Sequence, residues 1–188
     1  MGVRSRALGR RPSRRAESLS VIVLGIDPGL ANTGYGVVAQ REGHRLVALD
    51  GGMIQTRPGL ALERRLADIH AAVDALLAEH EPDGVALEEL YFGQNVKTAF
   101  AVGQARGVVM LAAGQREVAC ASYTPQKVKS AVCGNGRADK QQVARMVQAL
   151  LGLQAPPTPD HAADALAVAI CHANCAPLSR ALAGALGA

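Results

Sequence analysis

The sequence predicts an α/β domain: a mixed sheet, with three antiparallel strands followed by parallel strands, flanked by helices on both faces. Two observations lead to this prediction. Three apolar runs separated by turn residues come first, and helical and strand-like patterns then alternate along the rest of the chain. With 188 residues, 49% of them hydrophobic, the chain is long enough for one such domain with a substantial core.

The first three strands are expected to follow one another directly. Residues 21–26 are a continuous apolar run that Pro28 and Gly29 close, residues 34–40 form a second run, and residues 45–56 form a third after a polar turn. Strands joined by short turns pair in opposite directions. These runs therefore predict the antiparallel part of the sheet.

Helices and strands alternate over the rest of the chain. A helix is expected from Leu62, because apolar residues recur there at spacings of four and three until Pro82 ends the pattern. The later predicted elements are a strand at 84–88, a helix at 95–113, a strand at 117–121, a helix from Thr124 and Pro125, a helix at 139–151 and a last helix from His161.

Charge is distributed unevenly along the chain. Residues 1–20 hold six Arg and one Glu, which predicts a disordered basic arm. The folded domain is expected at 21–175 and a flexible C-terminal tail at 176–188. Residues 97–145 carry eight Lys or Arg against two acids, a pattern that suits a polyanion and equally a solvated surface.

The sequence gives no sign of a membrane segment or a disulfide framework. No apolar stretch approaches the ~20 residues that span a bilayer, and the arginine-rich beginning lacks a signal-peptide pattern. The four cysteines form no C-x-x-C pair and are expected to be free thiols. We therefore expect a cytoplasmic protein with no membrane partner.

Carboxylates stand where two of the predicted strands end. Asp27 follows the first strand, and Glu88 and Glu89 end the strand at 84–88. Because successive strand residues point to opposite faces, only one of these glutamates can join Asp27. His161 and Asp164 share a face of the last helix. Folding of these core segments would bring the acids together, and clustered buried acids require a cation.

Each of these acids also has a local interpretation. Asp27 can cap the turn at Pro28 through its own backbone. Thr158 or Asp160 can cap the last helix, and the helix dipole favours an acid such as Asp164 near a helix start. Three independent local roles are the less favoured interpretation, because all three segments are core-forming.

Five motifs occur in order along the chain: LGIDPGLANTGYG, ALEELYFGQN, GQARGV, QKVKSAVCGNGRADKQQV and DHAADALAVA. Over residues 20 to 173 they resemble the RuvC family of bacterial Holliday junction resolvases. The resemblance implies an RNase H-like fold and a homodimer that acts in recombination and DNA repair. It further implies paired, symmetric nicks in strands of like polarity at four-way DNA junctions, leaving 5′-phosphate and 3′-hydroxyl ends. A branch-migration complex of RuvA and RuvB is the partner that it implies.

The resemblance carries over to particular residues. It assigns catalysis and metal binding to Asp27, Glu88, His161 and Asp164, and it leaves out Glu89. Two divalent cations per subunit, Mg²⁺ or Mn²⁺, are implied as cofactors. From the resemblance and the basic stretch together, the residues predicted to contact DNA are Tyr91, Phe92, Asn95, Lys97, Lys127, Lys129, Arg137 and Lys140.

Two positions depart from the family pattern. Many members have Asp where this chain has His161, which leaves three carboxylates and one imidazole. Because imidazole binds transition metals better than an all-oxygen site does, Mn²⁺ is expected to support activity at least as well as Mg²⁺. Tyr91 stands where many members carry Phe, so its ring can still stack on a base but brings a hydroxyl group.

Two other classes of protein fit parts of the pattern. GIDPG followed by Gly34 and Gly36 resembles the phosphate loop of actin-like and sugar kinases. Those kinases need two sheet domains that close on a nucleotide, however, and this chain has the length of one. A binding module that has lost catalysis would not need four candidate metal ligands. Metal-dependent nicking of a synthetic junction separates a nuclease from both.

Overall fold

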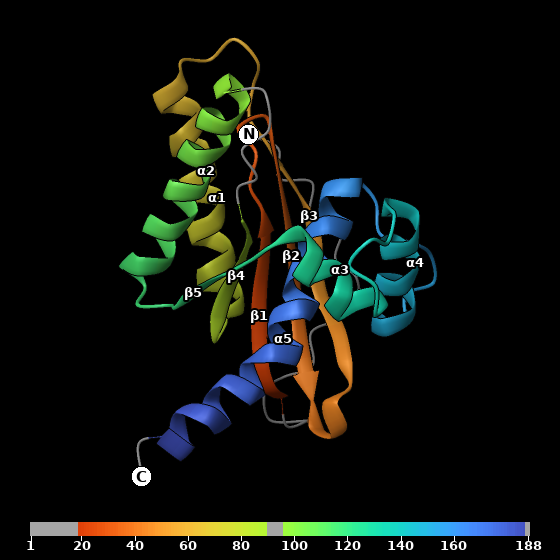
Figure 1. The fold of residues 1–188 in the computed structure, drawn as a ribbon. Helices are drawn as coiled ribbons and strands as arrows, with labels where there is room; N and C mark the ends of the chain where they lie inside the picture. Colours follow the sequence, from red (N-terminus) through yellow and green to blue (C-terminus); the bar gives the residue numbers. More distant parts are fainter. Residues whose placement is uncertain (1–18, 90–95, 187–188) are drawn as a thin grey trace.

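The computed structural model describes residues 19–89 and 96–186, and it confirms the mixed α/β architecture (Figure 1). Within these ranges five strands form one sheet, in the order β3-β2-β1-β4-β5. The strands are β1 (Leu19–Asp27), β2 (Asn32–Arg41), β3 (Leu46–Gln55), β4 (Gly84–Glu88) and β5 (Cys120–Tyr123). The helices are η1 (Glu42–His44), α1 (Leu62–His80), α2 (Val96–Gln115), α3 (Pro125–Cys133), α4 (Lys140–Leu151) and α5 (Asp160–Leu186).

The pairing of the strands is as predicted. Strands β1, β2 and β3 pair antiparallel, whereas β4 runs parallel to both β1 and β5. In the β1–β4 pair Ile26 lies opposite Leu87. The residues that follow them, Asp27 and Glu88, therefore end adjacent parallel strands at the same edge of the sheet, where α/β proteins commonly bind ligands.

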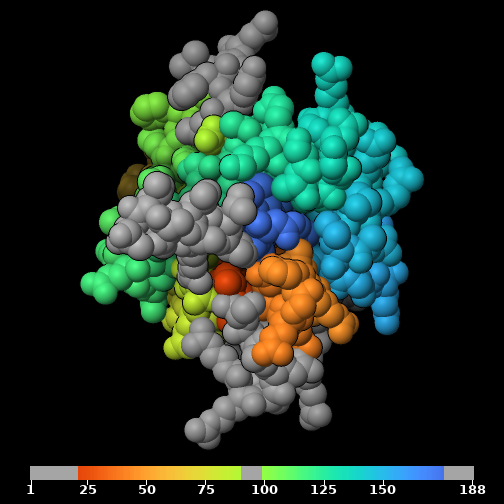
Figure 2. Space-filling model, turned by 60° about the horizontal axis from the view of Figure 1, so that its bottom comes forward, coloured from red at the N-terminus to blue at the C-terminus, as the bar shows by residue number. Residues whose placement is uncertain are grey.

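Helices cover both faces of the sheet. Side chains of β1 alternate between two cores: Ile22 and Leu24 pack with α1 and α2, and Val21 and Val23 pack with α3, α4 and α5 (Figure 1). Since Leu19 pairs with Arg41 in the β1–β2 ladder, the β2–β3 connection lies at the end of the sheet away from the carboxylates. Figure 2 looks onto that opposite end, with the connection in orange beside α5 in blue.

Three glycines let α5 lie directly on strands β1 and β2. A Cβ atom built on Gly25, Gly34 or Gly36 would lie 2.1, 2.0 or 2.6 Å from the nearest atom of α5, too close for any side chain. At Gly34 that atom is the carbonyl oxygen of His161. Because Gly34 pairs with Asp27 in the β1–β2 ladder, this contact brings the start of α5 over the end of β1.

The two helices beside α5 begin at well-defined caps. Helix α3 starts after Thr124, as predicted, and the Thr124 side chain accepts a hydrogen bond from the Lys127 main chain. Helix α4 starts at a capping box in which Asp139 and Gln142 each bond the other's main-chain N–H. The capping box fixes Lys140 at the first helical position of α4.

One boundary differs from the prediction. Strand β5 begins at Cys120, three residues later than expected, because the chain first closes α2 through a hydrogen bond from the Val118 N–H to the Ala113 carbonyl. Helix α5 continues to Leu186, into the segment at 176–188, whose flexibility stays a prediction. The predicted arm lies outside the described residues except at its last two, where β1 has already begun.

Two simpler expectations can also be checked on the described residues. None of their helices is long and apolar enough to cross a bilayer. The four cysteines are free thiols, as predicted: Cys120, Cys133, Cys171 and Cys175.

Candidate active site

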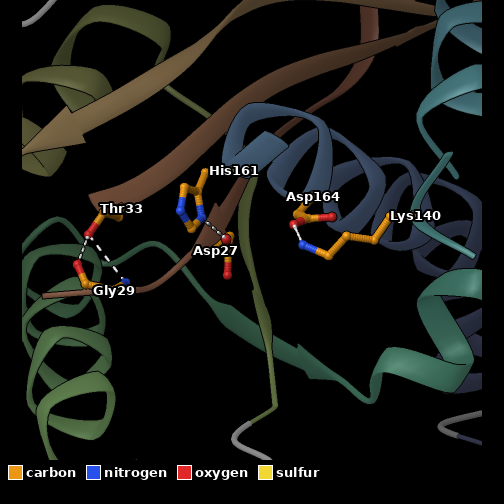
Figure 3. A network of polar contacts seen from close by, with 6 residues as sticks. All are labelled: Asp27, Gly29, Thr33, Lys140, His161 and Asp164. Atoms are coloured by element: carbon orange, nitrogen blue, oxygen red, sulfur yellow. Dashed lines mark hydrogen bonds and ion pairs between the residues drawn. The ribbon is translucent and has the colours of Figure 1, made fainter. Parts of the chain in front are cut away.

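Asp27 lies at the end of β1, and its carboxylate is hydrogen-bonded to the imidazole of His161. The distance from the His161 Nδ1 to the Asp27 Oδ2 is 2.8 Å, and the two side chains are 42% and 20% exposed (Figure 3). The two residues are 134 positions apart in sequence and meet because α5 packs on Gly34. With its Nδ1 held by the carboxylate, the imidazole keeps its Nε2 for another partner.

The turn after Asp27 is braced by a different residue, Thr33. This fully buried threonine donates its hydroxyl proton to the Gly29 carbonyl over 2.7 Å and accepts a longer bond from the Gly29 N–H (Figure 3). The interpretation that Asp27 serves to cap its own turn is therefore not needed. The carboxylate is directed towards His161 instead.

Glu88 is half-buried at the end of β4, while its neighbour Glu89 is exposed. Burial and, after it, the carboxylates of Asp27 and Asp164 raise the pKa of the Glu88 carboxyl, which the charges of Lys140 and Lys129 lower, to about 7. An influence of both acids on Glu88 requires the three carboxyl groups to gather at one end of the sheet. The expectation that only one of the two glutamates joins Asp27 agrees with this arrangement.

Asp164 lies one turn after His161 on α5 and is 29% exposed. Its carboxylate is 3.4 Å from the ammonium group of Lys140 at the start of α4 (Figure 3). Burial raises the pKa of the Asp164 carboxyl, against the lowering effect of Lys140. The proximity of Asp164 in turn raises the pKa of Lys140, so the lysine remains a cation beside the cluster.

The donor set fits a divalent cation. Three carboxylates and one imidazole are ligands for Mn²⁺ and related ions. A cation among them would offset both the burial and the carboxylate repulsion that raise the pKa of Glu88. In the part of the chain that the structure describes, no three His, Cys, Asp or Glu side chains are grouped as a formed metal site. Asp27 is instead hydrogen-bonded to His161, and Asp164 is hydrogen-bonded to Lys140.

The pKa of Glu88 predicts how stability without metal depends on pH. Because the folded pKa of about 7 lies above the usual 4.5, the folded chain holds this proton more tightly than the unfolded chain does. Stability in a chelator should therefore fall as the pH rises from the usual pKa of 4.5 to about 7 and level off above that. We expect Glu88→Gln to have the melting temperature of the wild type at pH 4 and a higher melting temperature than the wild type at pH 8. An equal difference at both pH values would contradict this.

The predicted DNA-binding residues have varied positions. Lys129 on α3 is half-buried, and its charge acts on Glu88. The Lys127 ammonium lies 5.1 Å from the centre of the Tyr123 ring, a cation–π contact, and Arg137 is exposed between α3 and α4. The remaining predictions fall on residues 90–95 or on a side chain outside the described set: Tyr91, Phe92, Asn95 and Lys97.

Sequence reasoning missed the residues that support the site. It placed Gly34 and Gly36 in the second strand or in a possible phosphate loop, whereas the structure shows that both lie on that strand beneath α5, where a side chain would not fit. It counted Arg106 only as part of a basic stretch. The Arg106 guanidinium in fact donates to the main-chain carbonyl of Glu88 over 2.7 Å. No local pattern signals either contact, because each joins segments that are distant in sequence.

A family model described as "Crossover junction endodeoxyribonuclease RuvC" matches residues 23–172, which include all four candidate catalytic residues. The chain belongs to the RuvC family. Two RuvC relatives are named crossover junction endodeoxyribonuclease: one from Moorella thermoacetica, 54% identical over 84% of this chain and 93% of its own, and one from Rubrobacter xylanophilus, 53% identical over 81% and 84%. Family members are DNA-cleaving hydrolases that use divalent metal ions.

Solved structures confirm the fold expected of a RuvC protein. The structure described as Thermus thermophilus RuvC in complex with Holliday junction substrate is 40% identical, has a TM-score of 0.81, and covers 85% of this chain and 96% of its own. The yeast mitochondrial Holliday junction resolvase Ydc2 is 16% identical with a TM-score of 0.57, which supports the fold alone. The predicted RNase H-like fold is therefore confirmed.

Proposed function

We propose that this protein is a metal-dependent endonuclease that resolves four-way DNA junctions during recombination and repair. The observation that carries the proposal is the gathering of Asp27, Glu88 and Asp164, seen in the influence of two of these acids on the pKa of the third. The family supports the substrate, because the Thermus thermophilus relative is described in complex with a Holliday junction. A protein that only bound DNA phosphates would gain nothing from clustered acids.

The acids have distinct proposed roles in holding cations. Asp27, at the centre of the cluster, would help to hold both cations, and Glu88 and Asp164 would each help to hold one of them. The two divalent cations would supply an activated water and stabilise the leaving 3′ oxygen. Loss of that oxygen from phosphorus leaves the 5′-phosphate and 3′-hydroxyl ends that we propose as products.

His161 would act as a ligand or as the group that orients the attacking water. Its contact with Asp27 favours a ring that donates from Nδ1 to the carboxylate and presents Nε2. From Nε2 it can accept a proton from water or bind a cation. Either role needs the ring direction that the Asp27 contact fixes.

Lys140 and Lys129 would bind the phosphate and balance charge as it develops. Lys140 is 74% exposed at its side chain, and its ammonium group already contacts the carboxylate cluster. The charge of Lys129, on α3, lowers the pKa of the Glu88 carboxyl. A lysine beside the reacting phosphate stabilises the added negative charge of the transition state.

The choice of metal follows from the imidazole. We predict that Mn²⁺ supports cleavage at least as well as Mg²⁺, because imidazole nitrogen is a poor ligand for Mg²⁺. Single-turnover rates at saturating metal test this. His161→Asp, which restores the acid found in many family members, should shift the preference towards Mg²⁺. A wild-type rate tenfold higher in Mg²⁺ would contradict the prediction.

Symmetric cutting requires two active sites, and helix α2 offers a surface on which a homodimer could form. One face of α2 packs on the core, while the opposite face exposes Phe100 and Leu111 at 69% and 54%. A Cβ atom built on Gly107 or Gly114 would have nothing within 4 Å, so a partner helix could approach closely. A two-fold dimer that pairs these faces would present two identical sites to a two-fold junction and so cut strands of like polarity.

The dimer can be tested by a charge on this face. We expect Leu111→Asp to convert the protein to a monomer in sedimentation experiments, because a buried unpaired carboxylate would oppose association. The rate of paired nicking should fall by a factor at least ten times larger than the factor by which affinity for a single DNA arm falls. Met146→Asp, at an exposed apolar position on α4, is the matched control. A Leu111→Asp protein that remains dimeric would exclude α2 as the interface.

The decisive test of the proposed function is cleavage of a synthetic four-way junction. Purified protein with Mn²⁺ should nick two opposed strands symmetrically and leave linear duplex of the same sequence intact. Chelation should stop cleavage but not binding. An intact junction under these conditions would overturn the proposal. Stacking of Tyr91 or Phe92 on opened bases, a cytoplasmic location, and cooperation with RuvA and RuvB remain further parts of the proposal.

A further inference from the structure

Arg106 joins the ends of two strands beside the candidate active site. This half-buried arginine extends from α2, and its Nη1 donates to the main-chain carbonyl of Glu88 over 2.7 Å. Its Nη2 donates to the hydroxyl of Ser122 on β5. One planar, rigid group therefore ties the last residue of β4 to the neighbouring strand.

The Glu88 carbonyl lies where the sheet no longer supplies partners on one side. Pairing of β4 with β1 ends at Leu87 and Ile26, one residue before Glu88. On the other side the ladder continues, since the Glu89 N–H donates to the Tyr123 carbonyl. A half-buried carbonyl needs a partner, and a charged guanidinium is a strong donor. Arg106 thus fixes the main chain at the residue that bears the carboxylate.

The influence of Arg106 on Glu88 differs from that of the lysines. The charges that act on the Glu88 carboxyl come from Asp27, Asp164, Lys140 and Lys129. Arg106 instead bonds the main chain of that residue. Its contribution is therefore to where the carboxylate lies rather than to its charge.

We propose that Arg106 is a positioning residue that holds Glu88 in the place from which it binds the divalent cation. This inference rests on the proposed function, because it takes Glu88 as a metal-holding residue. Groups that orient metal ligands typically change affinity or rate tenfold to about a hundredfold when they are removed. Loss of Arg106 should therefore weaken metal binding first and cleavage as a result.

The test compares Arg106→Gln with Arg116→Gln, a control just beyond the end of α2 that loses only the surface ion pair with Asp74. Mn²⁺ binding is measured by calorimetry without DNA, junction affinity in a chelator, and single-turnover cleavage over a range of Mn²⁺ concentrations. We expect Arg106→Gln to weaken Mn²⁺ binding at least about tenfold and to raise the Mn²⁺ needed for half-maximal rate equally. Excess Mn²⁺ should restore most of the rate, and junction affinity should stay within twofold.

Other variants keep the inference testable. Arg106→Lys, which retains one charged donor, should give an intermediate shift in Mn²⁺ affinity. If Arg106→Gln fails to fold, Ser122→Ala removes one end of the bridge and should shift Mn²⁺ affinity in the same direction by a smaller factor. Unchanged Mn²⁺ affinity in a folded Arg106→Gln or Ser122→Ala protein overturns the inference.

Two outcomes distinguish this inference from the proposed function. An active wild type whose Arg106→Gln variant binds Mn²⁺ normally but loses junction affinity would make Arg106 a DNA contact and overturn the positioning role alone. A wild type that leaves junctions intact would overturn the proposed function and this inference with it.

Discussion

Replacing Asp27 by Asn should abolish cleavage and leave junction binding intact. Asp27 is the acid that contacts His161, and its charge raises the pKa of both Glu88 and Asp164. The change therefore removes the charge at the centre of the cluster. A contribution of several kcal/mol to the transition state corresponds to a rate loss of at least about a thousandfold. Junction affinity should stay the same or rise slightly, since one negative charge near the DNA phosphates is lost.

The measurement is single-turnover cleavage at saturating protein beside junction affinity in a chelator. Glu89→Gln is the matched control, because it neutralises an exposed acid one residue from Glu88. That variant should cut within about twofold of the wild-type rate, since charges outside a site have small effects. An Asp27→Asn protein that cuts within tenfold of the wild type would show that the cluster is not the site of chemistry.

Gly34→Ala should displace the start of α5 and inactivate the protein without touching a carboxylate. The added Cβ would lie 2.0 Å from the His161 carbonyl oxygen, a main-chain atom that can move only with the helix. Overpacking of this kind costs about 1–3 kcal/mol of stability. A displacement near 1 Å between the two halves of the site costs about a hundredfold in rate.

Gly51→Ala is the matched control on the neighbouring strand. Its Cβ would lie 3.5 Å from a Leu166 side-chain atom, an ordinary van der Waals contact. Melting curves and cleavage rates of the two variants should therefore diverge, with Gly51→Ala close to the wild type. If Gly34→Ala cut at the wild-type rate, the packing of α5 on β2 would not determine the site geometry.

Local patterns were enough to predict the elements and the acids. Asp27 and Glu88 follow apolar runs that turn residues or loops close, so strand ends could be read directly from the sequence. His161 and Asp164 are three apart on a helix, a spacing that fixes a shared face. From the sequence alone, the convergence of these residues was a hypothesis. The order of the strands and the packing of α5 are what bring them together.

The supporting contacts could not be predicted in the same way. Gly34 looks like an ordinary residue at the start of the second predicted strand. The reason for its missing side chain is contact with a helix 127 positions later, at His161, and no local pattern reveals that contact. Arg106 looks like one more cation in a basic stretch, since its partner is a main-chain carbonyl on another element. Strand β5 starts late because Val118 belongs to the turn that closes α2, and an apolar residue such as valine does not indicate a turn.

Crystallography with Mn²⁺ tests the central claim most directly, because manganese is located by its anomalous scattering. Crystals of the wild-type protein grown with Mn²⁺ should show anomalous density between the carboxylates of Asp27, Glu88 and Asp164, and crystals of Asp27→Asn should lose it. Manganese bound elsewhere, or no manganese among these carboxylates in fully loaded crystals, would contradict the proposed role of the cluster.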